Sequence, residues 1–213
     1  GGSHAGLGGP SLGDTPGVSA VTYGDLYAPA TSGGGAAMGA AGGGVIRMNV
    51  SGTLAVHGTI SANGAGDLLG GGAGGSIDLE VNVLSGDGII SASGGDGSAN
   101  VDCGFLCSYS AGAGGGGRIA IRGHVALLDG FAPETMHHHV KALGGRSGEA
   151  SAAAGGAGTI FVQPKGSSAG DLIIRNGGEQ APTGSTALVT LPPGQLLTES
   201  RARSPLIAMQ ATC

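Results

Sequence analysis

The sequence predicts an all-β fold, a right-handed parallel β-helix of about four coils. The first observation is an internal repeat, because 31 residues separate Ile46 from Ile77 and 30 separate Ile60 from Ile90. A period between about 20 and 50 residues is typical of a solenoid, whose units bury their apolar faces by stacking on one another. The second observation is that apolar residues alternate in short runs bounded by glycine, which is typical of strands. Almost no α-helix is therefore expected.

Glycine is the most unusual feature of the composition. It accounts for 49 of 213 residues, about three times the usual share of roughly 7%. The glycines follow no three-residue period, and only 9 prolines accompany them, which excludes collagen. With 40% hydrophobic and 11% charged residues, the chain can bury enough apolar surface to fold. We interpret the glycines as boundaries of strands and corners, where the backbone needs a positive φ or approaches a neighbour closely.

The charge and hydropathy exclude some partners. Nine Lys and Arg against fourteen Asp and Glu give a net charge of −5, so nucleic acid is not expected as a partner. No run of about 18 apolar residues is present, so this segment is not expected to insert into a membrane. The chain opens at Gly1 and stops at Cys213 with neither an initiator Met nor a leader, which is typical of a processed piece or a part of something longer.

Residues 1–41 show little periodicity and are rich in glycine and proline. We predict an irregular coil that caps the N-terminal end of the array, because an open sheet edge needs a cover. A flexible tail is the alternative.

Residues 42–178 are predicted to form the repeats, with short strands whose side chains alternate between the core and the outside. The inward residues of the first repeat are Ile46, Met48, Val50, Leu54, Val56, Ile60 and Ala62. The matching residues of the second repeat are Ile77, Leu79, Val81, Val83, Ile90 and Ala92. Stacking of the repeats predicts two columns in the core, one of Ile46, Ile77, Ile119 and Ile160 and one of Ile60, Ile90 and Val140.

The later repeats are longer. Ile119 follows Ile77 by 42 residues, and Ile160 follows Ile119 by 41. We interpret the extra residues as two loop insertions, at 96–112 and 128–138. The pattern fades beyond Pro182, so residues 179–213 are predicted to form a C-terminal cap or tail.

Five glycine-rich motifs in this order carry a resemblance to a known kind of protein. They are Gly-Gly-Ser-His at 1–4, Gly-Gly-Gly-x-Ile-x-Met at 42–48, Gly-Thr-Ile-Ser-Ala-Asn-Gly at 58–64, Gly-Gly-Gly-Gly-Arg-Ile-Ala-Ile at 114–121 and Gly-Gly-Ala-Gly-Thr-Ile at 155–160. Together they resemble a glycine-rich parallel β-helix repeat region of very large secreted or cell-surface proteins of plants, algae and protists. The resemblance covers residues 1–178. It implies an extracellular or cell-surface location and a structural or adhesive role, without catalytic residues.

The cysteines fit a secreted chain. Cys103 and Cys107 lie four positions apart inside the first insertion, and we predict a disulfide between them. Metal binding is the alternative, but it would need further ligands that Cys213 alone does not supply. Cys213 is left over, so we expect its thiol to pair with another chain or with the rest of a longer one.

Two further motifs are candidates for modification or binding. Asn49-Val50-Ser51 is an N-glycosylation sequon on an outward-facing strand position, so Asn49 is a candidate glycan site. Sequons within strands are also often left empty. His137-His138-His139 is the string most like a metal site, with His137 and His139 on one side of an extended segment. No acidic or thiolate ligand follows at a suitable spacing, and a solvated loop is the other interpretation.

The leading functional hypothesis is a non-catalytic structural module of a large extracellular fibre, appendage, matrix or cell-surface protein that mediates assembly or adhesion. No cofactor or metal is expected, and the expected partners are other protein subunits or the rest of a longer chain, with glycans as a further candidate. The alternative is a polysaccharide-cleaving or polysaccharide-binding protein, by analogy with other parallel β-helices. Such cleavage needs clustered carboxylates and a basic residue, and Asp78, Glu80 and Arg47 supply them on one face. The same three residues equally form a solvated ion pair.

Overall fold

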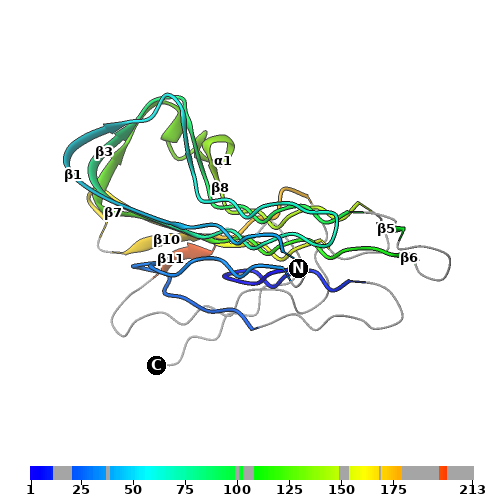
Figure 1. The fold of residues 1–213 in the computed structure, drawn as a ribbon. Helices are drawn as coiled ribbons and strands as arrows, with labels where there is room; N and C mark the ends of the chain where they lie inside the picture. Colours follow the sequence, from blue (N-terminus) through cyan, green and yellow to red (C-terminus); the bar gives the residue numbers. More distant parts are fainter. Residues whose placement is uncertain are drawn as a thin grey trace.

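The computed structural model of the chain describes residues 1–11, 21–36, 39–98, 101–102, 108–148, 154–167, 169–178 and 197–200. Two parts can be distinguished in Figure 1. Most of the β-strands gather in a lobe at one end, which we call the β lobe, whereas β5 and β6 lie at the opposite end. Glycine-rich segments run from the β lobe side by side as long wavy traces, which we call the glycine bundle.

The larger sheet of the β lobe has six strands. Their order is β1 (Val45–Ala55), β3 (Ser76–Ser85), β7 (Arg118–Leu127), β9 (Thr159–Pro164), β10 (Gly170–Ile173) and β11 (Leu197–Ser200). Strands β1, β3, β7 and β9 are parallel and stack one repeat on the next. Strand β1 therefore forms one edge of the sheet, and the closing strands β10 and β11 lie at the other.

The remaining elements are short. A three-stranded parallel sheet holds β2 (Thr59–Ser61), β4 (Ile89–Ser91) and β8 (Val140–Lys141). An antiparallel pair, β5 (Val101–Asp102) and β6 (Ser108–Tyr109), lies inside the predicted insertion 96–112. The described helices are a 3₁₀ turn, η1 (Asp129–Phe131), and one turn of α-helix, α1 (Met136–His139), so helix is scarce, as predicted.

The predicted core columns are confirmed. Ile46 lies opposite Ile77, Ile77 opposite Ile119, and Ile119 opposite Ile160. The second column, from β2 through β4 to β8, pairs Ile60 with Ile90 and Ile90 with Val140. Side chains of both sheets meet in one hydrophobic core. A register shift between Val50 and Thr53 places Leu54 opposite Leu84, which is fully buried. Leu84 therefore takes the inward place that was predicted for Val83, which is only half-buried.

The predicted parallel β-helix is wrong. The six-stranded sheet mixes parallel and antiparallel pairs, because β10 turns back and runs antiparallel to β9, and no closed solenoid forms in the described part of the chain. Only residues 165–169 connect these two strands, which is too short for a parallel crossover of about a dozen residues or more. The glycine-rich segments also leave the strands and pack in the bundle instead of closing a coil (Figure 1).

The glycine bundle is held together by backbone hydrogen bonds with a three-residue period. Gly71 and Gly74 donate their N–H groups to Gly112 and Gly115, at 3.1 and 2.9 Å. The next residues in the same turn, Gly72 and Gly75, donate to a different segment, at Ala65 and Ala62. A polyproline II helix has three residues per turn and makes no internal hydrogen bond, so its backbone groups point outward to neighbours. We conclude that the bundle consists of such extended helices, packed side by side.

Close packing of backbones explains why the bundle needs glycine. A Cβ atom on Gly74 would overlap the carbonyl oxygen of Ala92 and lie 2.8 Å from the nitrogen of Gly117. The expectation that glycines mainly mark strand boundaries and corners is therefore incomplete. Many of them are the packing surface itself, and a side chain would separate the segments.

Two segments that were predicted to lie outside the repeats, the N-terminal cap and the insertion 128–138, are packed into the structure. Within the predicted N-terminal cap, Gly2 donates to Gly71 and accepts from Gly115, both at 2.9 Å, so residues 1–9 are part of the bundle. The insertion 128–138, predicted to be a loop, contains η1 and the start of α1. It buries Phe131 and Met136 in the core, so it fills space between the two sheets.

Candidate functional site

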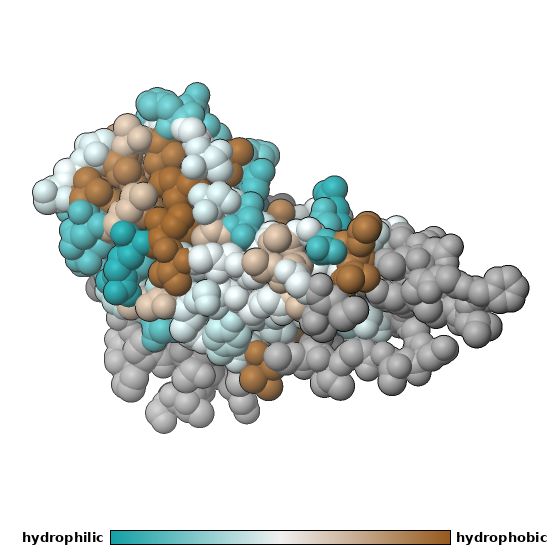
Figure 2. Space-filling view, viewed as in Figure 1, coloured by the Kyte–Doolittle hydropathy of each residue, from teal (hydrophilic) through white to brown (hydrophobic). Residues whose placement is uncertain are grey.

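At the β1 edge of the sheet, side chains of the hydrophobic core reach the surface. We call this surface the open end. It consists of apolar side chains of β1 and β2 that remain partly exposed: Ile46, Met48, Val50, Leu54 and Ile60. Their partners in the next repeat are at most 1% exposed: Ile77, Leu79, Val81, Leu84 and Ile90. Figure 2 shows apolar side chains gathered in the β lobe with hydrophilic residues around them. The difference in burial arises because no further repeat stacks on β1 and β2 in the described structure.

No described strand pairs with β1 on its outer side, although the Ser51 carbonyl accepts a hydrogen bond from the side chain of Asn82 at 2.7 Å. The N–H of Ser76 donates to Gly44, and Ile46 lies opposite Ile77 in parallel register. In such a ladder alternate residues bond to the neighbouring strand, so Ile46 and Met48 face β3. The N–H and C=O groups of the residues between them, Arg47 and its odd-numbered neighbours, point to the free edge. A free edge of this kind is a template for pairing with another strand.

A charge cluster lies beside the open end, on the outer face of the same sheet. Asp78 is 1% exposed, and its carboxylate accepts hydrogen bonds from Arg122 Nε and NH2 at 3.0 and 2.8 Å. Arg47 Nε lies 3.1 Å from the other carboxylate oxygen, and Glu80, half exposed, lies 3.8 Å from Arg122. The Arg122 guanidinium also stands over the Tyr27 ring, 5.0 Å from its centroid.

The cluster has the chemistry of a structural ion pair. Burial lowers the pKa of Arg122, but its hydrogen bonds to Asp78 and the charge of that carboxylate outweigh burial and raise the pKa above its ordinary value. Both carboxylate oxygens of Asp78 are engaged by arginines, which leaves this group poorly placed to exchange protons with a substrate. The structure thus brings the predicted residues Asp78, Glu80 and Arg47 together in the arrangement that the ion-pair interpretation describes.

Arg122 and Tyr27 are the members of this cluster that the sequence did not reveal. Arg122 lies opposite Glu80 in the register of β3 and β7, so alignment of the repeats could have found it. Tyr27 comes from the irregular N-terminal segment, and no repeat position predicts it.

A second polar network lies where the N-terminal segment meets the sheet. His4 is fully buried, with Nδ1 2.8 Å from the carbonyl oxygen of Gly74 and Nε2 2.9 Å from Thr31 Oγ1. Because a carbonyl only accepts, Nδ1 carries the proton and the Thr31 hydroxyl donates to Nε2. Burial lowers the pKa of His4 to about 4, and the Gly74 carbonyl opposes this shift. This role could not be predicted from the sequence, because an isolated histidine is more often found at the surface or in a turn.

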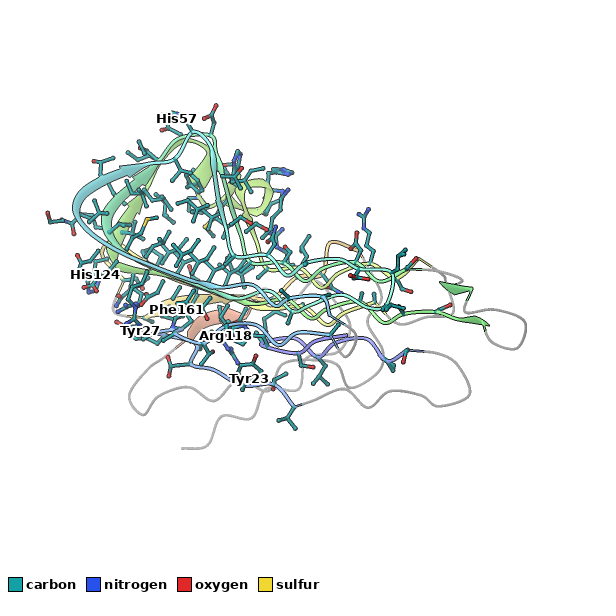
Figure 3. All side chains as sticks on the ribbon, in the orientation of Figure 1. Tyr23, Tyr27, His57, Arg118, His124 and Phe161 are labelled. Atoms are coloured by element: carbon teal, nitrogen blue, oxygen red, sulfur yellow. The ribbon has the colours of Figure 1, made fainter. Side chains whose placement is uncertain are left out.

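Arg118 anchors the same segment from the other side. It is 3% exposed, and its Nε and NH2 groups donate to the carbonyl oxygen of Tyr23 at 2.9 and 2.8 Å. Its NH1 group donates to Thr159 at 3.2 Å. Figure 3 shows Tyr23, Tyr27, Arg118 and Phe161 along the outer face of the six-stranded sheet. This network uses its hydrogen-bonding groups internally, so it fastens residues 21–31 to the sheet.

Four further histidines, His57 and His137 to His139, lie near one corner of the β lobe. His57 Nδ1 lies 2.8 Å from Asp87 Oδ1, and this hydrogen bond lowers the pKa of the exposed Asp87 carboxyl. His137 and His138 are exposed on α1, while His139 donates from Nδ1 to the Gly88 carbonyl oxygen. The extended arrangement expected for this string is therefore wrong, because the string forms a helical turn. Among the described residues no group of three or more His, Cys, Asp or Glu side chains is placed to hold a metal ion.

The remaining predicted sites have different outcomes. Asn49 is exposed on β1 and lies opposite Glu80. Cys103, Cys107 and Cys213 lie outside the described residues, so the predicted disulfide and the intermolecular thiol stay predictions. No helix in the described part of the chain is long and apolar enough to span a membrane.

Comparisons with protein-family models, with characterised proteins and with solved structures found no match for this chain.

Proposed function

We propose that the chain is a non-catalytic structural module of a larger extracellular or cell-surface assembly, in which it contacts other polypeptide at the open end of the β lobe. The observation that carries the proposal is the open end itself, where five core side chains remain partly exposed and no described strand pairs with the outer side of β1. A surface of this kind is suited to association with protein.

Two further features support a structural role. The glycine bundle ties segments that are far apart in sequence to one another through regularly spaced backbone hydrogen bonds, which favours rigidity. The best candidate for acid–base chemistry, Asp78, is committed to Arg122 and Arg47. The extracellular location rests on the resemblance of the glycine-rich motifs to repeat regions of large secreted and cell-surface proteins.

The test compares this role with the polysaccharide-cleaving alternative. Purified protein is incubated with pectin-like and alginate-like acidic polymers, and the release of new chain ends is measured against a heat-unfolded sample. The proposal expects no turnover above that background. Turnover that is lost in Asp78→Asn but kept in Glu134→Gln, a matched change at an exposed acidic residue outside the cluster, would overturn it in favour of an enzyme.

A further inference from the structure

The far end of the parallel stack demonstrates how an exposed strand of this repeat can be closed. There β10 pairs antiparallel with β9, and Ile173 lies opposite Ile160. The pair extends the column of Ile46, Ile77 and Ile119 by one more apolar side chain. The repeat strand therefore accepts an antiparallel neighbour on its free side, provided that the neighbour places apolar residues over the core.

Strand β1 of a second copy of the chain can serve as such an antiparallel neighbour for β1 of the first. A two-fold axis perpendicular to the sheet makes the β1 strands of two copies antiparallel, and the same patch then contacts itself. Each copy supplies the apolar alternation of Ile46, Met48 and Val50 that the other needs. We propose that two copies of this chain associate through β1 into a dimer whose larger sheet is continuous across the two-fold axis. This inference rests on the proposed structural role and names the partner at the open end.

The charge of Arg47 and the positions of the apolar side chains select the register in which the two β1 strands pair. Core side chains stay on the core side only if even-numbered residues lie opposite even-numbered ones. A register centred on Arg47 places two guanidinium groups directly opposite each other, which destabilises the pair. A register centred on Met48 places Met48 opposite its copy, Ile46 opposite Val50, and Arg47 opposite Asn49. A register centred on Asn49 would place Ile46 opposite Gly52, which has no side chain to cover it. The dimer is therefore centred on Met48.

From Val45 to Val50 the strand lacks the devices that usually keep an edge from pairing, whereas the register shift between Val50 and Thr53 limits pairing beyond that point. Lys, Pro and inward-pointing charges are common protections of exposed edges, and the sequence Val45–Ala55 contains none of them. Its one charged residue, Arg47, points outward and is held 3.1 Å from Asp78 of its own molecule. Nothing between Val45 and Val50 therefore opposes a second strand.

The first experiment measures the oligomeric state of the full chain, made in bacteria, by sedimentation equilibrium from low to high micromolar concentration. We expect the mass to approach twice the 20.0 kDa of the protomer. Asn49→Pro removes an N–H that faces the free edge and keeps the bonds to β3, a position where edge strands tolerate proline. We expect it to lose the dimer but keep the circular dichroism spectrum of the wild type, whereas Asn49→Ala should dimerise normally.

The second experiment tests the register by cross-linking. Residues directly opposite each other in a non-hydrogen-bonded antiparallel pair have Cα atoms about 4.5 Å apart, within the range of a disulfide. We expect Met48→Cys to form a disulfide between two copies, identified by mass spectrometry as a peptide joined to itself at position 48. Asn49→Cys is the matched control and should form no link to its own copy, because Arg47 faces it in the proposed register.

Several outcomes would overturn the dimer. A wild type that stays monomeric, a dimer that survives Asn49→Pro, or growth into open-ended polymers would each contradict it. A dimer that links at position 49 but not at 48 would contradict the register. None of these results produces turnover of a polysaccharide, so failure of the dimer can be distinguished from failure of the structural role.

Discussion

Ile46 lies directly opposite Ile77 in the parallel register of β1 and β3, yet Ile77 is completely buried and Ile46 is partly exposed. The two residues have the same type, the same strand position and the same inward orientation. Only the presence of a further repeat on the outer side of Ile77 separates them.

This pair provides a prediction about the core. Ile77→Ala should lower the free energy of unfolding by about 2 to 5 kcal/mol, as expected for a buried isoleucine. Ile46→Ala should cost about half as much or less at concentrations where the chain is monomeric, because its side chain is already partly in water. Urea denaturation measures both. Equal losses would mean that β1 is covered in the monomer.

The charge cluster provides a second prediction. Asp78→Ala leaves the guanidinium of Arg122, which is only 16% exposed, without its carboxylate, and should lower the free energy of unfolding by about 2 to 4 kcal/mol. The matched change Glu80→Ala removes a half-exposed carboxylate 3.8 Å from the same arginine and should cost under about 1 kcal/mol. Thermal denaturation at low and moderate salt gives both values. A larger loss for Glu80→Ala would contradict the assigned roles.

His4 provides a prediction about pH. Its folded-state pKa of about 4 lies below the value of about 6.5 for an unfolded chain, so the unfolded state binds more protons between these values. The stability that neutral His4 contributes is present above about pH 6.5 and is lost as the pH falls toward 4. By pH 4.5 the loss should reach about 2 to 3 kcal/mol.

The control for this effect is His4→Gln, which keeps a polar side chain but does not titrate. Other titrating groups contribute equally to both proteins. The decrease in the free energy of unfolding between pH 7.5 and 4.5 should therefore be smaller in the variant by about 2 to 3 kcal/mol. Parallel pH profiles for the two proteins would show that His4 is not buried in the neutral form.

The repeat spacing was enough to predict the columns of the core, but neither the register shift after Val50 nor the course of the chain between the strands. Columns such as Ile60, Ile90 and Val140 follow from alternation and stacking, which are local properties of sequence. The reversal at β10 depends on a connection of only residues 165–169, and the short apolar run from Leu172 to Ile174 does not indicate in which direction the strand runs. The sequence therefore predicted the strand but not that it runs antiparallel.

The glycine bundle was missed for a different reason. Its period of three appears in the hydrogen bonds, as in Gly71 and Gly74 to Gly112 and Gly115, and not in the positions of glycine along the chain. Alanines also occur among these glycines, such as the exposed Ala65 and the buried Ala73, so the sequence shows no regular glycine repeat. The buried role of His4 was missed because its partners, Gly74 and Thr31, are brought together only by the bundle.

The central claim is that glycines in the bundle are packing surfaces, and two adjacent residues test it most directly. A Cβ on Gly43 would overlap the backbone of Ala62 and Gly75, whereas a Cβ on Gly44 meets nothing within 4 Å. We predict that Gly43→Ala lowers the free energy of unfolding by about 3 kcal/mol or more, while Gly44→Ala leaves it unchanged or raises it by up to about 1 kcal/mol. Thermal denaturation of the two variants beside the wild type provides the comparison. If both alanine variants melted at the temperature of the wild type, the segments would not be packed backbone against backbone, and the account of the fold would be wrong.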